Sequence, residues 1–86
     1  MTVTVRTLTL IGRDGCHLCD DARAIITSVL AELDDSEEKR VLVEVDIDSD
    51  ADALRAYSEQ IPVLLIDGKV HNFWRIDRDR LLAALS

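Results

Sequence analysis

Cys16 and Cys19 constrain this chain more than any other feature, because they are its only cysteines and are separated by just two residues. The apolar stretch at residues 8–11 precedes them and indicates a strand. After them, apolar residues recur with the 3.6-residue period of an amphipathic helix as far as Leu33. The pair is therefore predicted to lie where a strand ends and a helix begins.

Length and charge narrow the class of protein. A chain of 86 residues predicts a single domain spanning residues 1–86, and 48% apolar residues argue against a disordered chain. Ten basic and seventeen acidic residues give a formal charge of −7, which disfavours nucleic acid and anionic membrane surfaces as partners. We recognise no signal peptide or membrane span and expect a cytoplasmic location, where a lone CxxC is more often catalytic or metal-binding than structural.

The remaining pattern alternates strands and helices. An Asp-Gly pair is a strong signal for a β-hairpin. The expected elements are a strand at 3–11, a helix at 16–33, a charged loop at 34–40, a strand at 41–47, a short helix capped by Ser49 or Asp50, a strand at 61–66, a turn at Asp67-Gly68, a strand at 69–74 and a final helix capped by Asp77. This β-α-β-α-β-β-α order predicts an α/β fold with a four-stranded mixed sheet flanked by helices.

Some conspicuous residues are expected to be structural. The acidic run at residues 46–52 looks like a calcium loop, but it lacks the glycine and glutamate that an EF-hand has at its sixth and twelfth positions. It is better explained by helix capping. His71 is expected to be an ordinary surface histidine. Phe73 and Trp74 are expected to close the small core.

The predicted position of the cysteines suggests redox chemistry. Thiol–disulfide exchange needs a thiolate, and a helix N-terminus favours negative charge at Cys16. Cys19 lies one turn further along and is expected to be more shielded. His17 and Asp14 carry charges that are expected to tune the acidity of the neighbouring thiol. From the residues alone, a shared metal or two simply buried cysteines remain as alternatives.

A second motif strengthens the redox interpretation. Ile61-Pro62 opens a strand before the hairpin, about 45 residues after the CxxC, and this combination resembles the thioredoxin-like fold. The short length and element order are similar to those of small glutaredoxin-like proteins. The resemblance implies that Cys16 is the nucleophile and Cys19 the resolving thiol. It also implies that Pro62 is a cis-proline against the disulfide, and that Ile61 offers backbone hydrogen bonds to a thiol substrate.

The resemblance also bears on glutathione. Arg13 matches a lysine that often helps glutaredoxins bind the glutathione carboxylate, and Asp77 stands in for the acid that holds the γ-glutamyl end. The dipeptide at residues 17–18 is His-Leu where glutaredoxins usually have Pro-Tyr. Phe-Trp at residues 73–74 lies in the segment where they usually have a Gly-Gly pair.

The sequence therefore predicts a thiol–disulfide oxidoreductase that uses a reversible Cys16–Cys19 disulfide. Its expected partners are a disulfide-containing protein or a small thiol, with glutathione or a thioredoxin reductase as candidate electron donors. No cofactor is expected to be required, and no resident metal is expected. Two alternatives come from other classes: a metal or iron–sulfur carrier that bridges a dimer through Cys16, and a non-catalytic binding module with the same fold.

Overall fold

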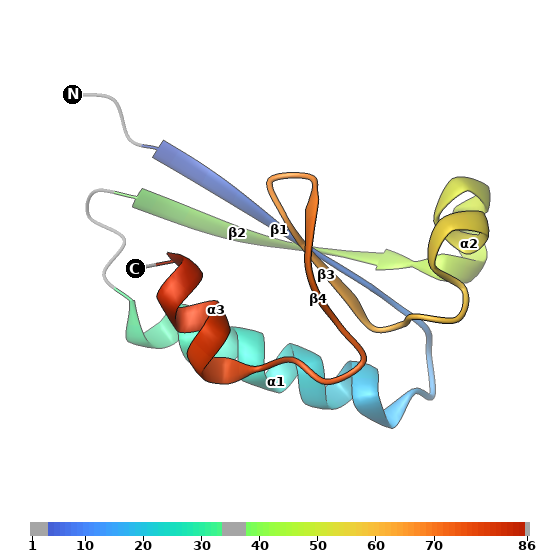
Figure 1. Ribbon diagram of the computed structural model, residues 1–86, viewed down its shortest axis with the longest axis horizontal. Coiled ribbons are helices and arrows are strands. Elements are labelled where there is room, and N and C mark those ends of the chain that lie inside the picture. Colours follow the sequence, from blue (N-terminus) through green and yellow to red (C-terminus); the bar gives the residue numbers. More distant parts are fainter. Residues whose placement is uncertain (1–3, 34–37, 86) are drawn as a thin grey trace.

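The structure is a computed structural model that describes residues 4–33 and 38–85 (Figure 1). Its elements are β1 (Thr4–Gly12), α1 (His17–Glu32), β2 (Glu38–Asp46), a 3₁₀ turn η1 (Ile47–Ser49), α2 (Ala51–Tyr57), β3 (Val63–Ile66), β4 (Lys69–Phe73) and α3 (Arg78–Leu85). The predicted β-α-β-α-β-β-α order is confirmed, and so is the α/β class. No helix within the described ranges combines the length and apolar character needed to cross a bilayer.

The four strands form one mixed sheet in the order β2-β1-β3-β4. β1 pairs with β2 in parallel and with β3 antiparallel, and β3 pairs antiparallel with β4. Gly12 lies opposite Asp46, so β1 and β2 end at the same edge of the sheet. The chain leaves β1 at this edge and enters α1, which places the two cysteines there.

One face of the sheet is covered by α1 and α3, which lie along the same side of the strands (Figure 1). Alternate residues of β1 and β3 point into this layer because side chains alternate along a strand. The main core consists of aliphatic side chains from the two strands, the two helices and the segment before α3: Leu8, Leu10, Ala22, Ile26, Val29, Leu64, Ile66, Ile76, Leu81 and Leu85.

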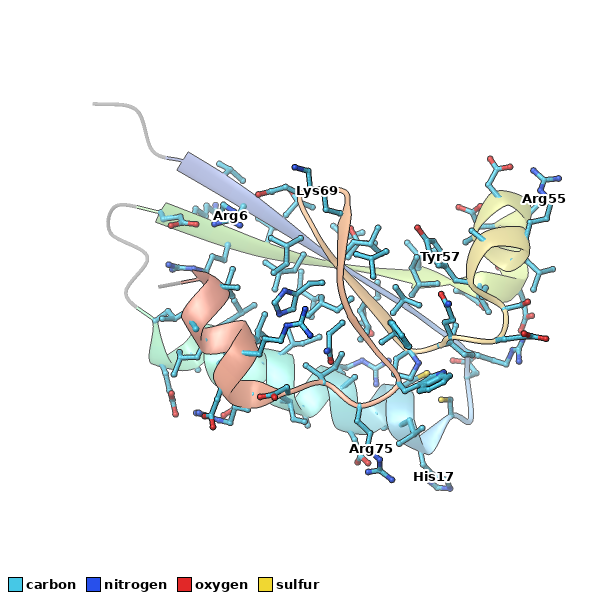
Figure 2. The ribbon with its side chains drawn as sticks, viewed as in Figure 1. Arg6, His17, Arg55, Tyr57, Lys69 and Arg75 are labelled. Carbon is cyan, nitrogen blue, oxygen red and sulfur yellow. The ribbon has the colours of Figure 1, made fainter. Side chains whose placement is uncertain are left out.

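The other face is covered only in part. A smaller cluster of Ile11, Ile47, Ala53, Val63 and Leu65 lies beneath α2. Figure 1 shows α2 at one end of the sheet, and Figure 2 shows Tyr57 turned towards the strands while Arg55 points outwards. Seven residues give α2 a length of about 10 Å. The described residues therefore leave the rest of this face open, with Val5, Val41, Val43 and Val70 exposed.

The second strand begins earlier than the sequence pattern suggests. Residues 38–40 were expected to lie in a loop, but they continue the parallel ladder of β2 against β1. Arg6 and Glu38 help to hold this end through an ion pair of 3.2 Å between Nη1 and Oε1. The other expected loop residues, 34–37, and the first expected residue of β1, residue 3, lie outside the described residues.

The acidic run at residues 46–52 caps two helical segments. Asp46 caps η1 and Asp50 caps α2, each through a carboxylate oxygen that accepts a backbone N–H at 3.0 Å. Ile47 was expected to end the strand, but it begins η1 and is fully buried. The acidic run therefore caps the N-termini of helical segments, which is a common role of aspartate.

The hairpin turn also holds β1. Asp67 and Gly68 have φ angles of 51° and 84°, as the predicted Asp-Gly turn requires. The Asp67 carboxylate accepts a hydrogen bond from the Thr7 backbone N–H at 2.9 Å and one from Arg6 Nε at 2.6 Å. These two donors lower the pKa of Asp67, the backbone donor most strongly. The turn is thus tied to the neighbouring strand.

The prediction for His71 was wrong. The side chain is half-buried, and its Nε2 is buried without a hydrogen-bond partner in the described part of the chain. Burial, followed by the positive charge of Arg80, lowers the pKa of His71. The charged side chains of Arg80 and Asp77 lie near enough to His71 to affect its pKa, and sequence alternation along β4 does not reveal this approach.

Candidate active site

Cys16 is the residue that starts α1. Its backbone is extended (φ −94°), and its Sγ accepts a hydrogen bond from the Cys19 backbone N–H at 3.2 Å. The sulfur thus takes the place that a serine or aspartate oxygen usually holds at a helix start. The N-terminal end of a helix favours negative charge at this position. The expected helix at 16–33 therefore has Cys16 and Leu33 as its caps.

Cys19 is almost completely buried, with 1% of its surface exposed, whereas Cys16 is half-buried. Both thiols are free. Burial raises the pKa of the Cys19 thiol to about 11, helped by its hydrogen bond with Cys16 and opposed by the Arg13 backbone. The site thus combines the accessible sulfur of Cys16 with the shielded, protonated sulfur of Cys19.

Gly12 makes room for the buried thiol, and sequence reasoning missed it. A Cβ at this position would lie 2.9 Å from the Sγ of Cys19 and 3.2 Å from its Cβ. The first distance is shorter than real Cβ contacts allow. The available signal was a glycine at the end of a strand, which often marks a close approach of another group.

We expect the reduced protein to lose stability in alkali because of Cys19. Its folded pKa of about 11 lies above the ordinary value of 9.0, so the stabilising effect of the neutral buried thiol is complete below about pH 9 and lost as the pH rises towards 11. The loss should be about 2 kcal/mol in the free energy of unfolding. Urea unfolding across this range measures it. Cys19→Ala should remove this part of the pH dependence, and an unchanged profile in that variant would contradict the assignment.

Arg13 is held by an acidic side chain. Its Nε and Nη2 donate to the two carboxylate oxygens of Asp48 at 2.9 and 3.0 Å. This hydrogen-bonded pair raises the pKa of Arg13, and the charge of nearby Cys16 contributes in the same direction. The expected role of Arg13 as an anchor for a substrate carboxylate stays a prediction. The guanidinium of Arg13 is already hydrogen-bonded to Asp48.

The other charged residues singled out from the sequence are dispersed. Asp14 is exposed in the loop before Cys16, and His17 is exposed at the first position of α1, pointing into solvent (Figure 2). Asp77 caps α3, since its carboxylate accepts the Arg80 N–H at 3.1 Å. The roles of Asp14 and His17 in tuning the thiol, and of Asp77 in binding substrate, stay predictions.

Ile61 and Pro62 lie immediately before β3, so the strand expected at 61–66 begins only at Val63. The peptide bond between them is cis, and Pro62 is fully buried while Ile61 is half-buried. The carbonyl of Pro62 accepts the backbone N–H of Trp74 at 2.8 Å. This bond joins the beginning of β3 to the end of β4.

Phe73 and Trp74 do not close the core, contrary to the prediction, because they remain 41% and 52% exposed. Aliphatic side chains already fill the interior at this end of the sheet. The two rings meet edge to face with centroids 5.1 Å apart. They line an open groove of about 640 Å³, here called the apolar groove, together with Leu18, Ile61 and Arg75.

A smaller polar pocket of about 250 Å³ is lined by Cys19 and lies between β1, β2 and the start of α1. Arg23 crosses it and donates to Asp20 and to Glu44. Carboxylates and guanidinium groups here neutralise one another. Among residues 4–33 and 38–85, no group of three or more His, Cys, Asp or Glu side chains is arranged to hold a metal ion.

Comparisons with known proteins agree with this geometry. The model of the Glutaredoxin-like domain (DUF836) family matches residues 7–86. The uncharacterized protein Rv0508 of Mycobacterium tuberculosis is 34% identical over 82 residues, which cover 90% of this chain and 79% of the relative.

Solved structures show the same architecture. XcR50 from X. campestris has a TM-score of 0.70 at 36% identity, covering 91% of this chain and 93% of that one. Ne2328 from Nitrosomonas europaea has a TM-score of 0.80 at 28% identity, covering 100% and 98%. A thioredoxin variant from Halobacterium salinarum, at 22% identity and a TM-score of 0.64, covers 94% of this chain and 72% of its own and shares the fold.

Proposed function

Because this chain belongs to the Glutaredoxin-like domain family, we propose that it is a thiol–disulfide oxidoreductase that cycles Cys16 and Cys19 between a dithiol and a disulfide. The observation that carries the proposal is the arrangement of the two thiols. A half-buried sulfur caps α1, and a second sulfur lies buried one turn later. The Cys19 N–H lies 3.2 Å from the Cys16 sulfur, so the residue that resolves the reaction also supports the nucleophile.

The reaction divides into two exchanges. The Cys16 thiolate attacks one sulfur of a substrate disulfide, so a bond forms to Cys16 while the substrate S–S bond breaks and one substrate thiolate leaves. Cys19 then loses its proton and attacks the Cys16 sulfur, which releases the second substrate thiolate. The substrate gains two electrons and two protons, and the enzyme ends as the Cys16–Cys19 disulfide. A thiol or dithiol donor returns the enzyme to its reduced state by the reverse exchanges.

The two cysteines have different roles in this scheme. Cys16 is accessible enough to meet a substrate, whereas Cys19, 1% exposed, reaches only a sulfur that is already joined to Cys16. We assign Ile61 and Pro62 to the substrate side of the site, since Ile61 lines the apolar groove. The expected substrates are disulfides of proteins or small thiols. Glutathione and a thioredoxin reductase are the candidate donors, and a reducing cytoplasm is the expected setting.

A redox titration tests the proposal. The protein is equilibrated in glutathione buffers of graded potential, quenched by alkylation and weighed by mass spectrometry. We expect one two-electron transition from dithiol to a Cys16–Cys19 disulfide, at a potential between about −270 and −120 mV. Turnover of a protein disulfide should then appear with either glutathione or thioredoxin reductase as the electron source. A protein that forms no such disulfide at any potential, and shows no turnover with either source, would refute the proposal.

A further inference from the structure

We propose that the apolar groove selects polypeptide disulfides, in which the reacting cysteine is flanked by a bulky apolar residue and an acidic residue, over glutathione disulfides. This inference rests on the proposed function, because it names the substrate class of the same site. Its parts are the apolar walls from Leu18, Ile61 and Trp74 and the guanidinium of Arg75, which has no ion-pair partner among the described residues.

The walls of the groove come from the segments that surround the reacting sulfur. Leu18 lies between the two cysteines, and Ile61 precedes the buried Pro62. Phe73 and Trp74 close the other side. Because Leu18 links the groove to the two cysteines, a substrate joined to Cys16 can place its flanking residues against these side chains. Apolar side chains at those positions gain contact area there and leave water.

Trp74 is held in the groove at a conformational cost. Its φ of 64° lies in the left-handed region, which glycine adopts easily and a bulky residue rarely does. Its indole Nε1 donates to the Glu59 carbonyl at 3.0 Å, and its backbone N–H donates to Pro62. The backbone of Trp74 is thus strained and its half-exposed indole is fixed by one hydrogen bond. Such backbone strain is concentrated at functional sites. The indole takes space in the apolar groove that a glycine would leave free.

Charge gives the groove its second preference. Most arginines in the described residues are paired with carboxylates, as Arg13 is with Asp48 and Arg78 with Glu32. Arg75 forms no ion pair within residues 4–33 and 38–85. Figure 2 shows it extending outwards on the same side of the molecule as His17 at the start of α1. An exposed, uncommitted guanidinium at the rim suits a carboxylate on the incoming chain.

Glutathione meets this groove poorly. It is a short polar tripeptide with two carboxylates and an ammonium group, and it has no apolar side chain to place against Leu18 and Trp74. An extended polypeptide can present one carboxylate to Arg75 and an apolar side chain to the walls.

Chromogenic peptides test the inference. Three peptides, Glu-Phe-Cys-Phe-Glu, Lys-Phe-Cys-Phe-Lys and Glu-Gly-Cys-Gly-Glu, are each joined through cysteine to thionitrobenzoate, and glutathione is joined in the same way. Attack of Cys16 on the peptide sulfur breaks the S–S bond and releases the coloured thiolate, and Cys19 then frees the peptide. Rates for the reduced protein are divided by the rates with dithiothreitol, which corrects for intrinsic reactivity.

We expect the acidic aromatic peptide to react best. It should exceed the glycine peptide and the glutathione compound by about tenfold through apolar contact, and the lysine peptide by about threefold to fivefold through charge. Arg75→Glu should reverse the order of the acidic and lysine peptides. Lys69→Glu makes the same change in net charge at the hairpin tip, on the side of the molecule away from Arg75 (Figure 2), and should leave the order unchanged.

A second variant tests the wall. Trp74→Gly suits the φ of 64° and removes the indole, so it should lower the preference for the aromatic peptide and raise the relative rate with the glutathione compound. Circular dichroism confirms that each variant is folded. Equal corrected rates for all four compounds, or the fastest rate with the glutathione or lysine compound, would overturn this inference while leaving the proposed function intact. Release from none of them would overturn the proposed function itself.

Discussion

Replacing Cys16 with serine is expected to lower disulfide reduction by at least about a thousandfold, because a hydroxyl is not ionised at neutral pH and is a far weaker nucleophile towards sulfur than a thiolate. The fold should survive, since serine is a good residue at a helix start and its oxygen can accept the Cys19 N–H in place of sulfur. Release of thionitrobenzoate from its symmetrical disulfide under single-turnover conditions measures the loss.

Cys19→Ser should fail at a different step. The first exchange needs only Cys16, so one equivalent of coloured thiolate should be released at a rate close to that of the unaltered protein. The mixed disulfide should then persist, because no buried thiol is present to attack the Cys16 sulfur. Mass spectrometry of the intact protein detects the adduct on Cys16.

The two variants are expected to fail at different exchange steps, and this difference distinguishes the roles of Cys16 and Cys19. Ala31→Ser adds a hydroxyl to an exposed position near the far end of α1 and serves as the control, with unchanged rates. Should Cys19→Ser lose the first exchange while Cys16→Ser keeps it, the roles would be reversed. Unchanged turnover in both variants would remove the cysteines from the reaction.

Local sequence signals were enough to predict much of the fold. The Asp67-Gly68 turn, the capping of α3 by Asp77 and the position of Cys16 at a helix start each depend on a few neighbouring residues. Such features are encoded by local backbone preference and hydrogen bonding. The order of elements followed from them, and with it the placement of the two cysteines at the end of β1.

Features of the site that depend on contacts between residues far apart in sequence could not be predicted. Arg13 is paired with Asp48, which lies 35 positions away in sequence, on the segment that follows β2. Phe73 and Trp74 were expected in the core because aromatic residues usually bury their area. They are exposed because the aliphatic core is already complete without them. Periodicity reports which side of an element a residue occupies, but not whether another element covers that side.

Gly12 is the clearest case of such a contact, and its replacement should have a large effect. In Gly12→Ala the new methyl group would lie 2.9 Å from the Cys19 sulfur, so the thiol or the backbone of β1 must move. Overpacking of this kind costs about 1–3 kcal/mol of stability. The shift of Cys19 should also slow its attack on the mixed disulfide by about tenfold or more, because a displacement of an ångström at a reacting atom is expensive.

Two comparisons separate the steric effect from a general loss of stability. Gly68→Ala also adds a methyl group to a glycine, but the cost there comes from the positive φ of 84°, since nothing lies within 4 Å and the turn is remote from the cysteines. It should lower the urea midpoint without slowing the resolving step. In a Cys19→Ala background, Gly12→Ala should cost less stability than in the unaltered protein, because the sulfur it would strike is gone.

The coupling energy between Gly12→Ala and Cys19→Ala shows whether Gly12 affects stability through the thiol or through the backbone. If the two substitutions are additive, the alanine methyl group acts through the β1 backbone and not through the thiol. A coupling of about 1 kcal/mol or more would show that the absence of a side chain at Gly12 fixes the position of Cys19. The rate of the resolving step should then follow the same pattern: it is slowed in Gly12→Ala and unaffected in Gly68→Ala. The close contact at the end of β1 would thereby set both the burial of the second thiol and the rate at which it completes the exchange.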